Sequence, residues 1–225
     1  MRPEEIENPV DSVGSYNVRV AVIDIGKPGK SLAWAIDDPN EEGSDLDECI
    51  EALATALAEG AVALGFEAPQ FVPVRDDPMK LTAARSGESG PGLPTRPFSA
   101  GAGATVLVTS LVIVPYVLRR LRERTSGTTV TLDWRRPINK PGHLLLFEAF
   151  VADQRKTTAT RHVEDAKLAI ADFRSGMTHP ASFESSVTSP ECLSLLGAAL
   201  LRTGWSSDLA LLSTPCLVVR SKSRG

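Results

Sequence analysis

Residues 18–25 read Val-Arg-Val-Ala-Val-Ile-Asp-Ile, and this stretch decides how the fold begins. A short apolar run that is dense in β-branched residues and ends at Gly26 is typical of a buried strand. The turn at residues 26–29 and the run SLAWAI at residues 31–36 then predict a second strand, antiparallel to the first. Asp24 stands near the end of the first strand, so the fold is expected to begin with a hairpin that carries a buried carboxylate.

Beyond this hairpin, helical and strand patterns alternate along the chain. Residues 37–44 are polar and are expected to form a loop, after which Ser44 can cap a helix over residues 45–59. The later predicted elements are strands at 61–66, 130–133 and 144–147, helices at 101–124, 160–173 and 190–203, and at 217–219 either a last strand or a docked tail. This order predicts an α/β fold with a mixed β-sheet flanked by helices.

The sequence also suggests how the chain is divided. Residues 1–16 are acidic and lack an apolar core, so we expect a flexible N-terminal tail rather than a signal peptide. Residues 17–225 are expected to form a single domain, with a long loop at 70–99 and a C-terminal helical extension at 180–225. A loop of that length inside a compact domain is usually functional or disordered.

Composition limits the function classes and the compartment. The formal net charge is -4 and the pI is near 5.5, so any nucleic-acid contact would need a local basic patch. The three cysteines are odd in number and lack metal-ligand spacing, which indicates unpaired thiols in a reducing cytoplasm.

Residues 100–118 are apolar enough to be considered as a membrane-spanning helix. Residues 100–118 carry no charge and precede four arginines, so their length and flanks both permit a spanning helix. Small residues at the start of the stretch and Pro115 favour a buried helix of an α/β core instead. We therefore expect no membrane contact.

Acidic residues follow three of the predicted apolar strands. Asp24, Glu67 and Glu148 stand at or just after strand ends, and the helix at 160–173 offers Asp165. Functional groups of α/β sheets gather at strand ends, and a buried carboxylate is costly unless something compensates it. Hard cations such as Mg²⁺ or Mn²⁺ take oxygen ligands, and two such ions can hold the attacking and leaving oxygens of a phosphodiester. The alternative is that these acids are solvated or cap helices.

Basic residues are the candidates for substrate contacts. Lys27 follows the first strand, and Arg75, Arg85 and Arg96 punctuate the long loop, where they could contact phosphates or simply be solvated. His162, one position from the acidic helix stripe, could aid proton transfer or could simply be a surface histidine, which is the default interpretation.

The quoted residues resemble a known family. The runs AVIDIGKPGKSLAWAI (21–36), AVALGFEAPQFVPV (61–74), LLLFEAFVA (144–152) and RHVEDAKLAIADF (161–173) are similar to predicted ribonuclease H-like nucleases of unknown function. The family pattern has an acid in the first strand, a hairpin, an acid-x-Pro after a later strand, a further strand with an acid, and a helix rich in Asp and Ala. Asp24, Glu67, Glu148 and Asp165 match these acids, although Asp is commoner at position 67 and many members double the helix Asp.

The resemblance implies a ribonuclease H-like fold and a Mg²⁺- or Mn²⁺-dependent nuclease. Asp24, Glu67 and Asp165 would then be metal ligands, Glu148 a ligand or a positioner of the base, and nucleic acid the partner. Two alternatives remain open. The chain could be a catalytically inactive ribonuclease H-like binding module, or an actin-like nucleotide- or phosphate-binding protein, which Asp24-Ile-Gly26 followed by Lys27 also resembles.

Overall fold

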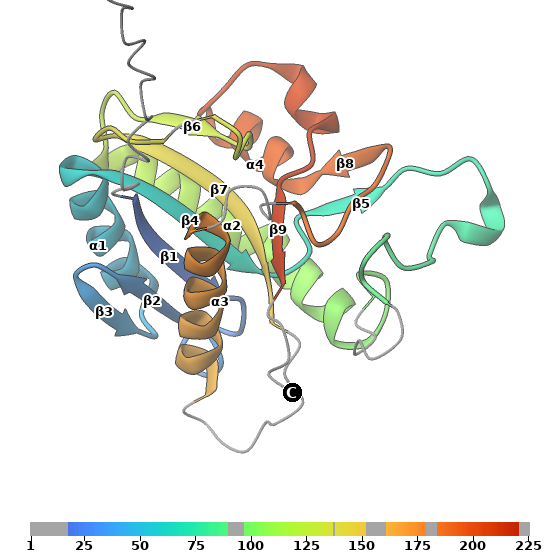
Figure 1. Ribbon diagram of the computed structural model, residues 1–225, viewed down its shortest axis with the longest axis horizontal. Helices are drawn as coiled ribbons and strands as arrows, with labels where there is room; N and C mark the ends of the chain where they lie inside the picture. The colour runs from blue at the N-terminus through green and yellow to red at the C-terminus, as the bar shows by residue number, and fades with distance from the viewer. Residues whose placement is uncertain (1–17, 90–96, 137, 152–160, 179–183, 221–225) are drawn as a thin grey trace, which may run out of the picture.

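The predicted hairpin begins a mixed β-sheet in the computed structural model of the chain, which describes residues 18–89, 97–136, 138–151, 161–178 and 184–220 (Figure 1). β1 (Val18–Asp24) pairs antiparallel with β2 (Ala33–Asp37), as the sequence predicts. The expected tail at residues 1–16 lies outside the described residues.

The sheet is built mainly from parallel strands. Within the described ranges its order is β3-β2-β1-β4-β7-β6, and β9 pairs with the later half of β7. Among the described strands of this sheet, β2 alone runs in the direction opposite to the others. The other strands are β3 (Asn40–Gly43), β4 (Ala61–Glu67), β6 (Thr129–Thr131), β7 (His143–Phe150) and β9 (Leu217–Arg220).

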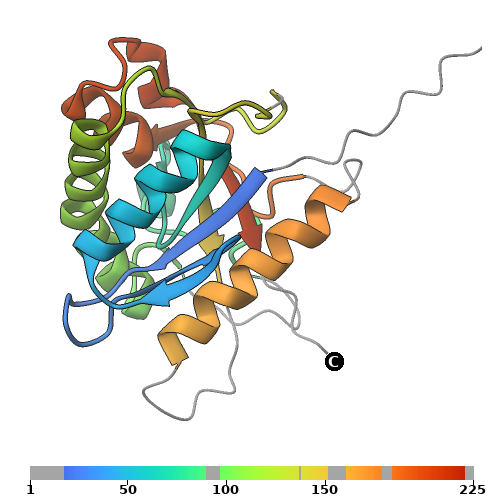
Figure 2. The ribbon, with the colours of Figure 1, turned by 90° about the vertical axis from the view of Figure 1, so that its left-hand side faces the viewer.

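Helices cover both faces of this sheet. They are α1 (Leu46–Glu59), α2 (Gly101–Arg124), α3 (Arg161–Thr178) and α4 (Leu195–Thr203). α3 packs on one face across β1 and β2, while α1 and α2 lie on the other face with α4 against α2 (Figure 2). The predicted α/β class, with a mixed sheet flanked by helices, is confirmed.

Strand alternation sends successive side chains into two separate cores. Even-numbered residues of β1 and odd-numbered residues of β4 and β7 pack on the α3 face, and their neighbours pack beneath the other helices. On the α3 face a Cβ at Gly65 would lie 2.4 Å from the Phe147 ring. Glycine therefore leaves room for Phe147 to pack against Phe173 of α3, with ring centroids 4.6 Å apart. This contact holds α3 close to the sheet.

The segment expected to be a loop at residues 37–44 instead contains β3, the edge strand of the sheet. Its residues Asn40, Glu41 and Glu42 are exposed and mostly charged, which hides the strand from a hydrophobicity pattern. Charged side chains on an edge strand oppose unwanted pairing with another chain. The helix that follows is capped by Asp45, whose side chain accepts from the backbone N–H groups of Asp47 and Glu48, rather than by Ser44.

The long loop and the C-terminal segment contain more structure than predicted. β5 (Phe71–Pro73) pairs with β8 (Cys192–Ser194) in a second, two-stranded sheet, and short 3₁₀ helices occur at Pro78–Lys80 and Leu209–Ser213. The helix expected at 190–203 thus begins only after β8. Residues 217–219 belong to β9, which joins the main sheet beside β7.

The apolar helix α2 is only partly buried. Of the described helices, α2 is the one that is long and apolar enough to cross a membrane. In the most apolar 18-residue stretch of this helix, 33% is buried. Val114, Val117 and Leu118 in its C-terminal half lie in the core, whereas Val108 and Val112 are 64% and 72% exposed. The expected buried helix is therefore found for the second half and is wrong for the first. The absence of membrane contact stays a prediction.

Candidate metal centre

Asp24 and Glu67 end two adjacent parallel strands. They are register partners of β1 and β4, so their Cα atoms lie side by side, about 4.8 Å apart. Strand alternation directs both side chains toward the α3 face. The apolar residues before them fix this register because a one-residue slip would move every buried side chain to the wrong face.

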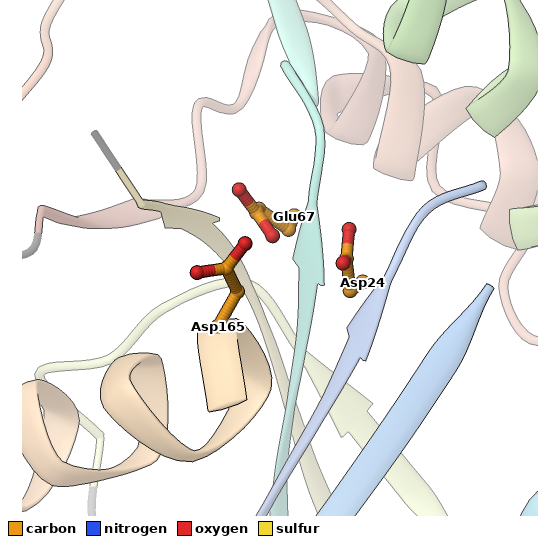
Figure 3. A group of neighbouring side chains, drawn as sticks. All are labelled: Asp24, Glu67 and Asp165. Atoms are coloured by element: carbon orange, nitrogen blue, oxygen red, sulfur yellow. The ribbon is translucent and has the colours of Figure 1, made fainter. Parts of the chain in front are cut away.

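The third carboxylate comes from α3. Asp165 is 7% exposed, and Ala166 and Ala169 beside it are fully buried, which lets the helix approach the sheet closely. One ligand oxygen each from Asp24, Glu67 and Asp165 lies within 4.8 Å of the other two. Figure 3 shows the three carboxylates turned toward one another from three separate elements. The predicted grouping of these three acids is confirmed.

This grouping perturbs Asp24. Burial raises the pKa of the Asp24 carboxyl above its usual value, and the nearby charge of Asp165 adds to the rise. Hydrogen bonds with Glu67 and His162 work in the opposite direction without cancelling the effect. Bringing the charged forms of these acids together thus costs free energy. Attraction to a cation bound between them would offset this cost.

His162 belongs to the same site. Its Nδ1 lies 2.5 Å from Asp24 Oδ2, and its side chain is 37% exposed. The histidine is thus partly exposed at the surface, as the default interpretation has it, and its ring is also bound to a buried acid of the site. The spacing could have indicated this, since His162 and Asp165 are three residues apart and share one face of a helix.

Glu148, the fourth predicted acid, is not part of this group. It has even parity in β7, so its side chain points to the face opposite α3, and Ala149 takes the position level with Glu67. Both oxygens of Glu148 are bound by Arg85, at 2.8 and 2.6 Å, and Oε2 also accepts from the backbone N–H of Gln70 at 2.9 Å. Glu148 is thus a structural ion-pair partner, which corrects its expected catalytic role.

Arg85 is the centre of this buried ion pair and does not face substrate. Its side chain is fully buried, donates to Glu88 Oε1 at 2.8 Å, and lies over the Phe71 ring at 4.5 Å. Burial acts to lower the pKa of the guanidinium, but the charges of and hydrogen bonds with Glu148 and Glu88 hold it above its ordinary value. The predicted role of Arg85 in substrate binding is corrected to anchoring the long loop on the sheet.

The other three basic residues predicted to contact substrate lie in different places. Arg75 donates to the backbone carbonyls of Lys80, Ala83 and Ala84, so its guanidinium holds the loop together. Lys27 is exposed in the β1–β2 turn, just after the strand that carries Asp24. Arg96 lies outside the described residues.

The donor set suits a hard divalent cation. Three carboxylates from separate elements offer only oxygen atoms, and Mg²⁺ and Mn²⁺ prefer such ligands. The three buried cysteines are free thiols, as predicted, and do not belong to this group. Asp24, Glu67 and Asp165 are therefore the residues that would hold an ion.

Comparison of the chain with protein-family models, curated proteins and solved structures finds no significant match.

Proposed function

We propose that this chain is a Mg²⁺- or Mn²⁺-dependent nuclease that hydrolyses phosphodiester bonds on a ribonuclease H-like fold. The observation that carries the proposal is the convergence of Asp24, Glu67 and Asp165 within 4.8 Å at the ends of two parallel strands. Three separate elements supply these acids. The repulsion between their negative charges is unfavourable unless the carboxylates bind a common cation.

The pattern of the resembled family supports the fold part of this proposal. The acid in the first strand, the following hairpin, the Glu67-Ala68-Pro69 motif after a later strand and the acid-bearing helix over the sheet all have counterparts among the described elements. Glu148 departs from the family pattern, because its carboxylate forms an ion pair with Arg85. The proposed site therefore relies on three carboxylates and not on four.

The roles of the chain's own residues follow from their positions. A divalent cation bound by the three acids would supply charge neutralisation at a phosphoryl oxygen and polarise the phosphorus–oxygen bond. Asp24 and Glu67 are held by the sheet and Asp165 by a helix packed on it, so all three are rigid before a ligand arrives. His162 Nδ1, on Asp24, is placed to hold or release a proton at the edge of the site.

The first prediction concerns metal binding. In Mn²⁺ at about one hundred times its dissociation constant, the melting temperature should rise by about 5–10 °C, because such binding adds about 2.7 kcal/mol to the free energy of unfolding. Thermal unfolding with Mn²⁺, Mg²⁺ and a chelator measures this rise. The same preparation should cleave single-stranded or duplex DNA or RNA only when a divalent ion is present.

Glu67→Gln tests whether the rise and the cleavage come from this site. It should lower cleavage at least about 100-fold, since even residues that only support metal ligands cost 10- to 100-fold. Glu59→Gln is the matched control, because Glu59 is an exposed acid at the end of α1 that pairs with Arg19. Equal loss in both variants, or cleavage that persists in the chelator, contradicts the proposal.

A further inference from the structure

A surface cavity of about 150 Å³ lies directly beside the acidic group. Asp24, Glu67 and His162 line one side of it, and the rest of the lining is apolar. A cavity of this volume with an apolar lining accepts a single benzene-sized ring in an engineered protein core. Space next to the acids is therefore available for a planar ring and not only for water and an ion.

The apolar walls come from the start of α2, the end of β7 and the residues that follow β1 and β4. Ala102 and Gly103 belong to the first turn of α2, Ala149 and Phe150 to the end of β7, and Ala68 follows Glu67. Small side chains at these positions leave the space open. Phe150, which is 7% exposed and lies under the Arg220 guanidinium, contributes apolar surface to the wall. Ala102 is exposed, so the cavity reaches solvent and the polar edge of a base could stay hydrated there.

We propose that this cavity receives the single-ring base of a pyrimidine nucleotide whose phosphate lies at the acidic group. This inference rests on the proposed function, and it specifies the substrate as an unpaired pyrimidine nucleotide. A base can enter the cavity only when it is outside a duplex stack. The apolar lining distinguishes ring size but offers no side-chain pattern that distinguishes cytosine from thymine.

Binding of mononucleotides in Mn²⁺ tests the inference without any turnover. Isothermal titration of the full chain with deoxycytidine and thymidine 5′-monophosphates should give similar affinities for both. Deoxyribose 5-phosphate, which lacks the base, should bind about tenfold or more weakly, since burial of an apolar ring of this size is worth about that much. Deoxyadenosine 5′-monophosphate should also bind more weakly because its double ring exceeds the cavity.

Ala102→Phe places a ring in the cavity from its exposed rim. The affinity of this variant for deoxycytidine monophosphate should fall to the affinity for deoxyribose 5-phosphate. Val108→Phe adds the same ring to the same helix at a position that is 64% exposed and outside the cavity, and it should change neither affinity. Melting temperatures of both variants report whether they are folded.

The outcomes separate the inference from the function on which it rests. If Mn²⁺ binds but the base adds no affinity, or Ala102→Phe binds deoxycytidine monophosphate as the wild type does, the inference is wrong and the metal site stands. Equal or tighter binding of the purine nucleotide also overturns it. If Mn²⁺ itself does not bind, both the inference and the proposed function fail.

Discussion

Asp24→Asn should stabilise the metal-free protein and at the same time abolish metal binding. At neutral pH the free energy of unfolding should rise by about 1–3 kcal/mol, the order expected for removing a buried charge that its hydrogen bonds with Glu67 and His162 compensate only in part. The reason is that burial and the charge of Asp165 both raise the pKa of Asp24, so its ionised form is the unfavourable one in the folded state. An Asn at this position carries no charge and can still hydrogen-bond to Glu67.

The pH dependence fixes the sign of this effect. Because the folded pKa of Asp24 is raised above its ordinary value of 3.8, the folded state holds the proton more tightly than the unfolded state. The stability it contributes is complete below 3.8 and is lost as pH rises through the folded pKa. The advantage of Asp24→Asn should therefore be absent in acid and should appear as pH rises, measured by denaturant unfolding at several pH values in chelator.

Addition of Mn²⁺ should reverse the order of stability. The wild type gains from the ion and the variant does not, so cleavage and the thermal shift should both disappear in Asp24→Asn. Asp37→Asn is the matched control at the end of the neighbouring strand, where Asp37 accepts from Val20 N at 2.9 Å and Arg174 Nε at 2.6 Å. It should lose about 1 kcal/mol and keep its Mn²⁺ affinity. A destabilised Asp24→Asn, or one that still binds Mn²⁺, rules out the proposed role of Asp24.

How far the sequence determines this site is clearest from its three acids. The sequence places Asp24 near the end of the predicted strand at 18–25 and Glu67 directly after the predicted strand at 61–66, and the register of β1 and β4 pairs these two acids. Asp165 follows from helical spacing and the small residues beside it. Local pattern and chain order were sufficient here because each acid lies at a recognisable point of its element.

Glu148 shows where the same reasoning fails. Strand β7 is buried on both faces, so residues 144–147 and 149–151 are apolar without alternation and give no sign of which face Glu148 occupies. Its partner Arg85 is 63 residues away in a segment with no periodic pattern. The pairing depends on β5, whose three residues join a strand near the C-terminus, and no local signal predicts that contact.

Replacement of Arg85 should be the most destabilising single change outside the apolar cores. Arg85→Met should lower the free energy of unfolding by about 3–5 kcal/mol, the range for breaking a buried ion pair by removing one partner. Glu148 and Glu88 are both fully buried and would lose the guanidinium that binds them. Phe71 O would lose a donor as well, at 3.2 Å.

The cost should be partly recovered by removing the charges of Glu88 and Glu148 as well. The triple variant Arg85→Met, Glu88→Gln, Glu148→Gln should regain much of the loss, because neutral amides need no buried cation. Arg75→Met is the control, since among the described residues Arg75 donates to carbonyls of its own loop, and its replacement should cost about 1 kcal/mol. If the single variant loses no more than this control, Arg85 does not anchor the loop. If the triple variant binds Mn²⁺ as the wild type does, Glu148 has no part in the metal site, as its position on the opposite face of the sheet requires.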